Sequence, residues 1–189
     1  GITSIYLQAE GEVLLYPEYW KLVEYCQSRK MTVMNLITNG LLIGEFIPEI
    51  LKHHTAVTIS VDGYNAETYT QRRGGTAETF NRVIENTKRL ISERDSIKSH
   101  VQIAYNCVIM QSNYHIIPSM IALAEQIGLD RVQFRNFHRY DPSDIEALPL
   151  YDTLEVVDYL AELQKQKYKV EVQWPGLYGE IETFNCSML

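Results

Sequence analysis

Apolar residues recur along this chain at two spacings, and segments with one spacing alternate with segments that have the other. Across 57–61 and 101–109 every second residue is apolar, which is the pattern of a strand with one buried face. Across 77–91 the apolar residues return at helical spacing, which predicts a long amphipathic helix. The whole pattern predicts strands at residues 2–7, 32–37, 55–61, 101–109, 131–135 and 168–173. It predicts helices at residues 17–29, 45–52, 76–94, 117–128 and 150–165, and a polar loop at 141–149.

Strands that alternate with helices of this length predict βαβ units and therefore a parallel sheet. The fold class is α/β, either as an open sheet or as part of a (βα) barrel. In barrels of this kind the chemistry takes place at the C-terminal ends of the strands. The residues that follow each strand are therefore the candidates for a functional site.

Composition narrows the range of functions. The chain has 189 residues, which fits one domain, and its net charge of −7 argues against a general nucleic-acid binder. No apolar stretch reaches the length needed to span a membrane, and the first residues do not form a signal peptide, so we expect a cytoplasmic protein. The chain has no initiator Met and starts in a strand-like run, so we expect it to be cut at its beginning.

The three cysteines, Cys26, Cys107 and Cys186, lie far apart in the sequence. An odd number at these spacings does not predict a disulfide framework, and no two are spaced as ligands of one metal. Cys26 and Cys107 are expected to be small buried apolar residues.

Polar residues follow the first and third predicted strands. Gly11 allows the backbone to approach a ligand closely, and Glu12 beside it could accept hydrogen bonds from an ammonium group. Ser60 and Asp62 point to the same side if their strand continues, and a hydroxyl with a carboxylate suits a ribose or an amino-acid head group. From spacing alone, a solvated acidic turn at 10–12 and a structural Asp-Gly turn at 62–63 remain open as alternatives.

Arg73 precedes two glycines and the long predicted helix. A helix N-terminus with an arginine could receive a carboxylate or phosphate, and a flexible loop with solvated arginines is the alternative. The sequence contains no nucleotide-binding glycine loop after its first strand. It also contains no order of Ser, His and Asp residues that indicates a catalytic triad.

Taken in order, these segments resemble the radical S-adenosylmethionine (SAM) superfamily. The resemblance runs over nearly the whole chain, and the run from Ser60 to Gly75 is typical of its peptide-modifying branch. It rests on Glu10–Glu18, Thr38-Asn39-Gly40, Ser60-Val61-Asp62-Gly63, Asn65–Tyr69, Arg73-Gly74-Gly75, Asn86, Asn113 and Gly128–Val132. Ala9 and Val13 stand where the family usually has glycine and proline, which concerns the shape of the loop rather than its charge.

The resemblance implies a fold and a set of roles. The fold would be a partial (βα)6-type barrel of parallel strands whose first βα unit is missing. Glu12 would accept the amino group of SAM, with the backbone of Gly11 beside it. Ser60 and Asp62 would bind the ribose or the methionine carboxylate, and Arg73 would pair with that carboxylate. The backbone near Gln133 would meet the edge of the adenine.

The family's cluster motif, CxxxCxxC, is absent from this chain. In the family these cysteines precede the segment that matches Glu12, so ligands for the catalytic 4Fe–4S cluster are expected outside the 189 residues. We therefore expect residues 1–173 to form a partial radical SAM core. Residues 174–189 resemble the entry to a SPASM or twitch extension, where Cys186 would be the first ligand of an auxiliary iron–sulfur cluster.

The resemblance implies a radical SAM enzyme that cleaves SAM reductively and removes a hydrogen atom from a peptide or small metabolite, with an electron donor as partner. On this reading the chain alone is inactive. One alternative is a SAM-binding or interaction module without redox chemistry. Another is an unrelated (βα) barrel enzyme that uses Glu12 and Asp62 as acid and base.

Overall fold

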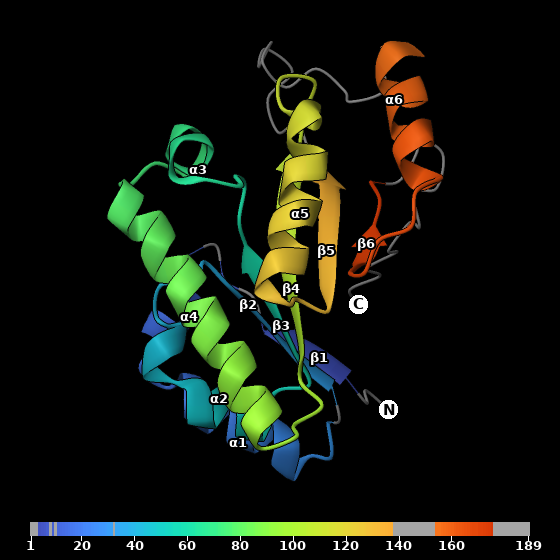
Figure 1. The fold of residues 1–189 in the computed structure, drawn as a ribbon. Coiled ribbons are helices and arrows are strands. Elements are labelled where there is room, and N and C mark those ends of the chain that lie inside the picture. The colour runs from blue at the N-terminus through green and yellow to red at the C-terminus, as the bar shows by residue number, and fades with distance from the viewer. Residues whose placement is uncertain (1–3, 8, 10, 32, 138–153, 176–189) are drawn as a thin grey trace, which may run out of the picture.

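The computed structural model describes residues 4–7, 9, 11–31, 33–137 and 154–175. Their six strands form one parallel sheet in the order β1-β2-β3-β4-β5-β6, so each strand pairs with its neighbour in sequence (Figure 1). The strands are β1 (Ser4–Leu7), β2 (Val33–Thr38), β3 (Ala56–Ser60), β4 (Gln102–Ile109), β5 (Arg131–Asn136) and β6 (Glu171–Gln173). The predicted α/β class and parallel sheet are confirmed.

Helices connect successive strands, as parallel pairing requires. They are α1 (Tyr19–Ser28), α2 (Ile47–His53), α3 (Ala66–Arg73), α4 (Ala77–Ser96), α5 (Ile117–Ile127) and α6 (Leu154–Gln164). Short 3-10 turns lie at η1 (Val13–Leu15), η2 (Ile43–Glu45) and η3 (Tyr114–Ile116). None of the helices in the described residues combines the length and the apolar character needed to cross a membrane.

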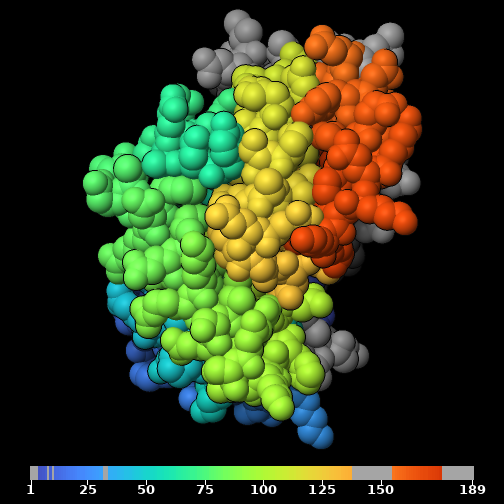
Figure 2. Space-filling view, in the orientation of Figure 1, coloured from blue at the N-terminus to red at the C-terminus, as the bar shows by residue number. Residues whose placement is uncertain are grey.

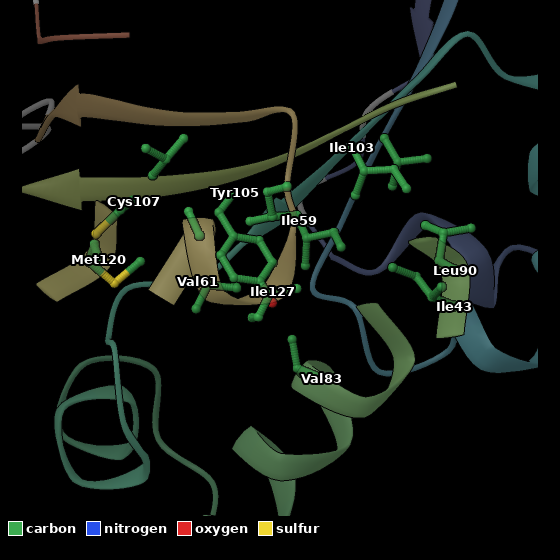
Figure 3. Close-up of a cluster of buried hydrophobic side chains, with 14 of the residues drawn as sticks. Ile43, Ile59, Val61, Val83, Leu90, Ile103, Tyr105, Cys107, Met120 and Ile127 are labelled. Carbon is green, nitrogen blue, oxygen red and sulfur yellow. The ribbon is translucent and has the colours of Figure 1, made fainter. Parts of the chain in front are cut away.

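The two faces of the sheet differ in chemistry because successive side chains of a strand point to opposite faces. On the face toward the helices, Ile59, Ile103, Tyr105 and Phe134 are almost fully buried. Figure 3 shows part of this core, where the labelled side chains of β3 and β4 meet those of α4 and α5. The opposite face carries mostly polar side chains and borders a hollow.

Helices α4 and α5 lie over the apolar face of the sheet, and Figure 2 shows them next to each other at the front of the molecule. Their apolar sides are buried, with Val83 and Leu90 from α4 and Met120 and Ala124 from α5. Gly128 ends α5 in the left-handed conformation, with φ of 86°, as its position in the sequence predicted.

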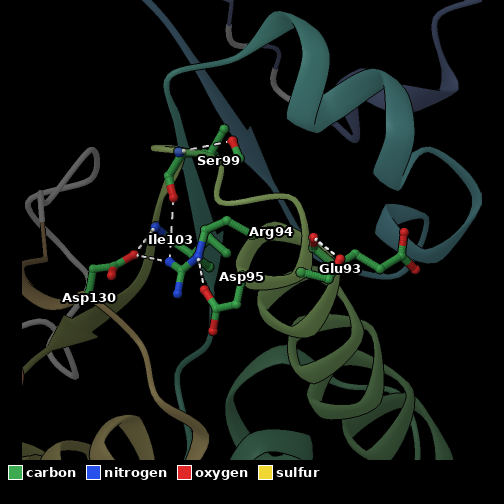
Figure 4. A network of polar contacts seen from close by, with 8 residues as sticks. Glu93, Arg94, Asp95, Ser99, Ile103 and Asp130 are labelled. Atoms are coloured by element: carbon green, nitrogen blue, oxygen red, sulfur yellow. Dashed lines mark hydrogen bonds and ion pairs between the residues drawn. The ribbon is translucent and has the colours of Figure 1, made fainter.

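An ion-pair network joins three elements at the N-terminal edge of the sheet (Figure 4). Arg94, near the end of α4, donates to the carboxylates of Asp95 and Asp130 and, at 3.4 Å, to the carbonyl of Val101. The Asp130 carboxylate also accepts the backbone N–H of Ile103 at 2.7 Å. The network therefore holds the end of α4 against the starts of β4 and β5.

The sequence pattern missed α3, and this changes the position of Arg73. The sequence left open whether Arg73 stands at a helix N-terminus or in a flexible loop, and the structure shows neither. Arg73 is the last residue of α3, and α4 begins at Ala77. Only Tyr69 of α3 is buried, so the helix has almost no apolar periodicity. The predicted loop at 141–149 lies outside the described residues.

Candidate functional site

Glu12 is held at the C-terminal edge of the sheet by three hydrogen bonds. Its Oε1 accepts the Thr38 hydroxyl at 2.8 Å and the N–H of Leu14 at 3.2 Å, and its Oε2 accepts the N–H of Asn39 at 2.7 Å. A carboxylate has about four acceptor positions, so one position on Oε2 remains for a ligand. The carboxylate is fixed in place and can still accept an N–H from an ammonium group.

The turn at residues 38–40, which holds Glu12, has a conformation and a packing that few other residues would allow. Gly40 has φ of +89°, and a Cβ there would lie 2.9 Å from Cγ2 of Ile59. Asn86 of α4 donates its amide to the carbonyls of Gly40 and Leu41 at 2.9 and 3.0 Å. In the sequence this turn contributes only to the resemblance, whereas in the structure its Thr38 hydroxyl and Asn39 N–H position the candidate ligand-binding carboxylate.

Asp62 occupies a similar place after β3. Its Oδ1 accepts the N–H of Val108 at 2.7 Å, and its Oδ2 accepts Nη1 of Arg73 at 2.6 Å. The ion pair is partly buried, with side-chain exposures of 28% for Arg73 and 14% for Asp62. One carboxylate thus links the ends of β3, β4 and α3. Glu12 and Asp62 both accept a backbone N–H, which fixes the orientation of each carboxylate at the edge of the sheet.

Two ionisable side chains close to Asp62 stay protonated. Burial raises the pKa of the Cys107 thiol well above its usual value, and the charge of Asp62 raises it further. Burial also raises the pKa of Tyr69, an effect that the neighbouring Arg73 opposes. Neither group is poised as a nucleophile or a base near neutral pH.

The polar face of the sheet borders a hollow of about 880 Å³, to which all six strands contribute. Ser60, Asn106 and Gln133 lie side by side in register across β3, β4 and β5 and face this hollow. Within the described part of the chain, none of these three side chains has a hydrogen-bond partner, whereas Asn35 and Thr58 bond to each other. The volume is that of a site for a small organic ligand.

The six predicted SAM-site residues are distributed between this edge and the hollow. Glu12, Asp62 and Arg73 lie at the C-terminal edge, and Ser60 and Gln133 face the hollow. Gly11 lies in the exposed loop before Glu12, and a Cβ there would have no atom within 4 Å. Cys186 lies outside the described residues.

Sequence reasoning missed Asn106 and Arg135, which also face the hollow. The signal was present, since residues 131, 133 and 135 are all polar on a strand whose alternate residues, Val132 and Phe134, are apolar. From the sequence we predict a strand at 131–135 and give a role only to the backbone near Gln133.

Polar groups at this edge fit SAM, because an acceptor position remains on Glu12 and the neighbouring hollow presents side chains without protein partners. The described residues do not fit an iron–sulfur cluster. They contain no group of three His, Cys, Asp or Glu side chains that could hold a metal ion. Cys26 and Cys107 are both buried in the core, on different elements, as predicted.

Comparison with known proteins decides the family. The sequence pattern of the radical SAM superfamily matches residues 1–103, which is more than half of the chain. The chain belongs to the radical SAM superfamily. No curated protein sequence matches it.

Solved structures of radical SAM proteins share the fold. SuiB of Streptococcus suis bound to S-adenosylmethionine aligns with a TM-score of 0.65 at 16% identity, over 89% of this chain and 38% of SuiB. A domain of pyruvate-formate lyase-activating enzyme from Bacteroides vulgatus aligns with a TM-score of 0.65 at 14% identity, over 93% of this chain and 100% of that domain. A radical SAM methyltransferase from Sphaerobacter thermophilus aligns with a TM-score of 0.63 at 13% identity, over 91% of this chain and 51% of that protein. The chain therefore spans well under half of SuiB.

Proposed function

We propose that this chain is the SAM-binding core of a radical SAM enzyme. The observation that carries the proposal is the Glu12 carboxylate, which is held by Thr38 and Asn39 at the C-terminal edge of the sheet and keeps one acceptor position. When bound and reductively cleaved, SAM supplies a 5′-deoxyadenosyl radical that removes a hydrogen atom from the substrate.

In this proposal, residues at the C-terminal edge of the sheet and in the hollow each bind a different part of SAM. Glu12 accepts the amino group of SAM, and the exposed backbone at Gly11 lies beside it. Ser60 binds the ribose or the methionine carboxylate, and Asp62 accepts hydrogen bonds from the ribose hydroxyls. Arg73 contributes its remaining N–H groups to that carboxylate while Nη1 stays on Asp62. The backbone near Gln133 meets the edge of the adenine.

The substrate in this proposal is a peptide or a small metabolite, and an electron donor is the second partner. A peptide is supported by SuiB, which is also known bound to precursor peptide SuiA and aligns with a TM-score of 0.66. The ligands of the catalytic 4Fe–4S cluster come from outside the described residues in this proposal. The SPASM-like extension at 174–189 and the role of Cys186 in an auxiliary cluster remain predictions.

A calorimetric titration of SAM into the 189-residue chain tests the binding step. We expect Glu12→Gln to weaken SAM binding about tenfold or more, since a hydrogen bond between charged groups contributes about 1.5–3 kcal/mol. The matched control is Glu18→Gln, because Glu18 is exposed in α1's N-cap and pairs only with Lys21 among the described residues. Equal SAM affinity in all three proteins, or no binding to any of them, would contradict the proposed site.

A further inference from the structure

The hollow differs in charge from the chain as a whole. Besides Tyr6, the ionisable side chains among the described residues that line the hollow are His100, Arg131 and Arg135. None of these lining residues is an Asp or a Glu. The whole chain carries a net charge of −7. The two arginines therefore place positive charge in a concave site of an acidic chain, and such a site attracts anions.

The two arginines of the hollow have different surroundings. Arg131 lies at the start of β5, and its Nη2 pairs with the Glu171 carboxylate of β6 at 2.9 Å. Arg135 lies four residues further along the same face, toward the C-terminal ends of the strands. Within the described residues it has no hydrogen-bond or ion-pair partner. The positive charge that is left for a ligand is therefore that of Arg135.

The surroundings of Arg135 add neutral hydrogen-bond donors. Gln133 precedes it by two residues on the same face, and Asn106 of β4 is in register with Gln133. Both amides face the hollow and have no hydrogen-bond partner in the described part of the chain. A guanidinium beside amide N–H groups matches an oxyanion, because its planar fork can bind two oxygens at once.

We propose that the hollow binds the substrate through an oxyanion group, a carboxylate or a phosphate, that Arg135 holds by a bidentate contact. Gln133 and Asn106 donate their side-chain N–H groups to the same ligand. That the ligand is the substrate rests on the proposed function, whereas the oxyanion site itself rests only on the residues that line the hollow and their charges. Gln133 serves both ligands in this proposal, its backbone toward the adenine and its side chain toward the oxyanion, whereas the Glu12 end of the SAM site lies beyond β1 and β2.

NMR titration of the ¹⁵N-labelled 189-residue chain tests the site with defined probes. We expect glutarate to shift the side-chain amide signals of Gln133 and Asn106 in a saturable manner. Glutaramide, which has the same carbon skeleton without charge, should bind at least about tenfold more weakly, as the loss of a charge-assisted contact implies. A titration with inorganic phosphate distinguishes the two kinds of oxyanion. If the chain binds phosphate more tightly than glutarate, the site is assigned to a phosphate group, and if it binds phosphate more weakly, the site is assigned to a carboxylate.

Variants of single arginines complete the test. Arg135→Gln should weaken glutarate binding about tenfold or more, and Arg135→Lys should restore part of it, because lysine keeps the charge but not the fork. The control is Arg82→Gln, since Arg82 lies on α4 and pairs with Glu45 away from the hollow. Equal shifts with glutarate and glutaramide, or full binding by a folded Arg135→Gln protein, would overturn the inference.

A parallel SAM titration separates this inference from the proposed function. If Arg135→Gln loses SAM affinity as strongly as it loses glutarate affinity, the guanidinium serves the cofactor, and the substrate site is wrong while the proposed function stands. If the unmodified chain binds glutarate through Arg135 but does not bind SAM, the oxyanion site stands and the proposed function fails.

Discussion

His54 shows how one buried polar residue is satisfied in this fold. Its Nδ1 lies 3.1 Å from the carbonyl of Met34, and its Nε2 lies 3.1 Å from the hydroxyl of Tyr19. A carbonyl can only accept, so Nδ1 carries the proton of the neutral ring, and the Tyr19 hydroxyl donates to Nε2. Adding a second proton would make Nε2 a donor, so the Tyr19 hydroxyl would have to turn and accept, and the ring would carry its charge in a buried position.

Protonation of His54 should therefore cost stability. Burial lowers the pKa of His54 from 6.5 to about 4, despite the opposing effect of its hydrogen bond to Met34. The unfolded chain binds the proton first, so the stabilising contribution is complete above pH 6.5 and is lost as the pH falls toward 4. We expect this residue to lower the free energy of unfolding by about 2 kcal/mol between about pH 7 and pH 5.

Urea unfolding at a series of pH values measures this contribution. The His54→Gln protein should show a smaller loss of stability over the same interval, whereas His115→Gln, which alters an exposed histidine, should follow the unmodified chain. Identical pH dependence for His54→Gln and the unmodified chain would show that the native state does not exclude the proton.

At the level of the elements, the sequence predicted what apolar periodicity encodes. The strand predicted at 101–109 and the helix predicted at 76–94 correspond to β4 and α4, with boundaries within about two residues. Periodicity fails for α3, because a helix with one buried side chain has no apolar stripe to detect. Its capping box, in which the Asn65 side chain accepts the N–H of Thr68 at 2.8 Å, was the available signal.

The candidate site was predicted only in part for a related reason. Glu12 and Asp62 stand out because they follow predicted strands, but their partners come from distant segments. Thr38 lies 26 residues from Glu12, and Val108 lies 46 residues from Asp62. Such pairs depend on the register of neighbouring strands, which a single sequence does not specify. The same is true of Arg135, whose role depends on which face of the sheet is hollow.

The network around Arg94 makes a prediction about how elements are joined. Arg94→Met removes the contacts to Asp130 and to the carbonyl of Val101 and leaves Asp130 with the N–H of Ile103. We expect the free energy of unfolding to fall by about 1–2 kcal/mol, a range that allows for the partial exposure of Asp130. Urea unfolding measures the change.

The matched control is Arg89→Met on the same helix, because Arg89 has an exposed side chain and is paired at 3.8 Å with Glu93 one turn away. It should change stability by less than about 0.5 kcal/mol. If the two variants lose equal stability, the network at the strand starts does not hold α4 more firmly than an ordinary surface pair.

At the scale of the whole molecule, the contacts that stabilise the fold and the polar groups of the candidate site lie on different parts of the sheet. The helix-covered face and the N-terminal edge with Arg94 hold the fold together. The C-terminal edge with Glu12 and Asp62, and the hollow beside it, carry polar groups that the fold leaves available for ligands. This division is characteristic of (βα) barrels, in which active sites gather at the C-terminal ends of the strands.

The most direct test of the account is the formation of 5′-deoxyadenosine from SAM. The protein that carries this chain would be prepared without oxygen, supplied with iron and sulfide, and given a strong reductant. We predict that 5′-deoxyadenosine forms, that Glu12→Gln lowers its rate about tenfold or more, and that Glu18→Gln leaves it unchanged. If none forms although the preparation binds SAM, the chain is a SAM-binding module without radical chemistry, and the proposed enzyme function is wrong.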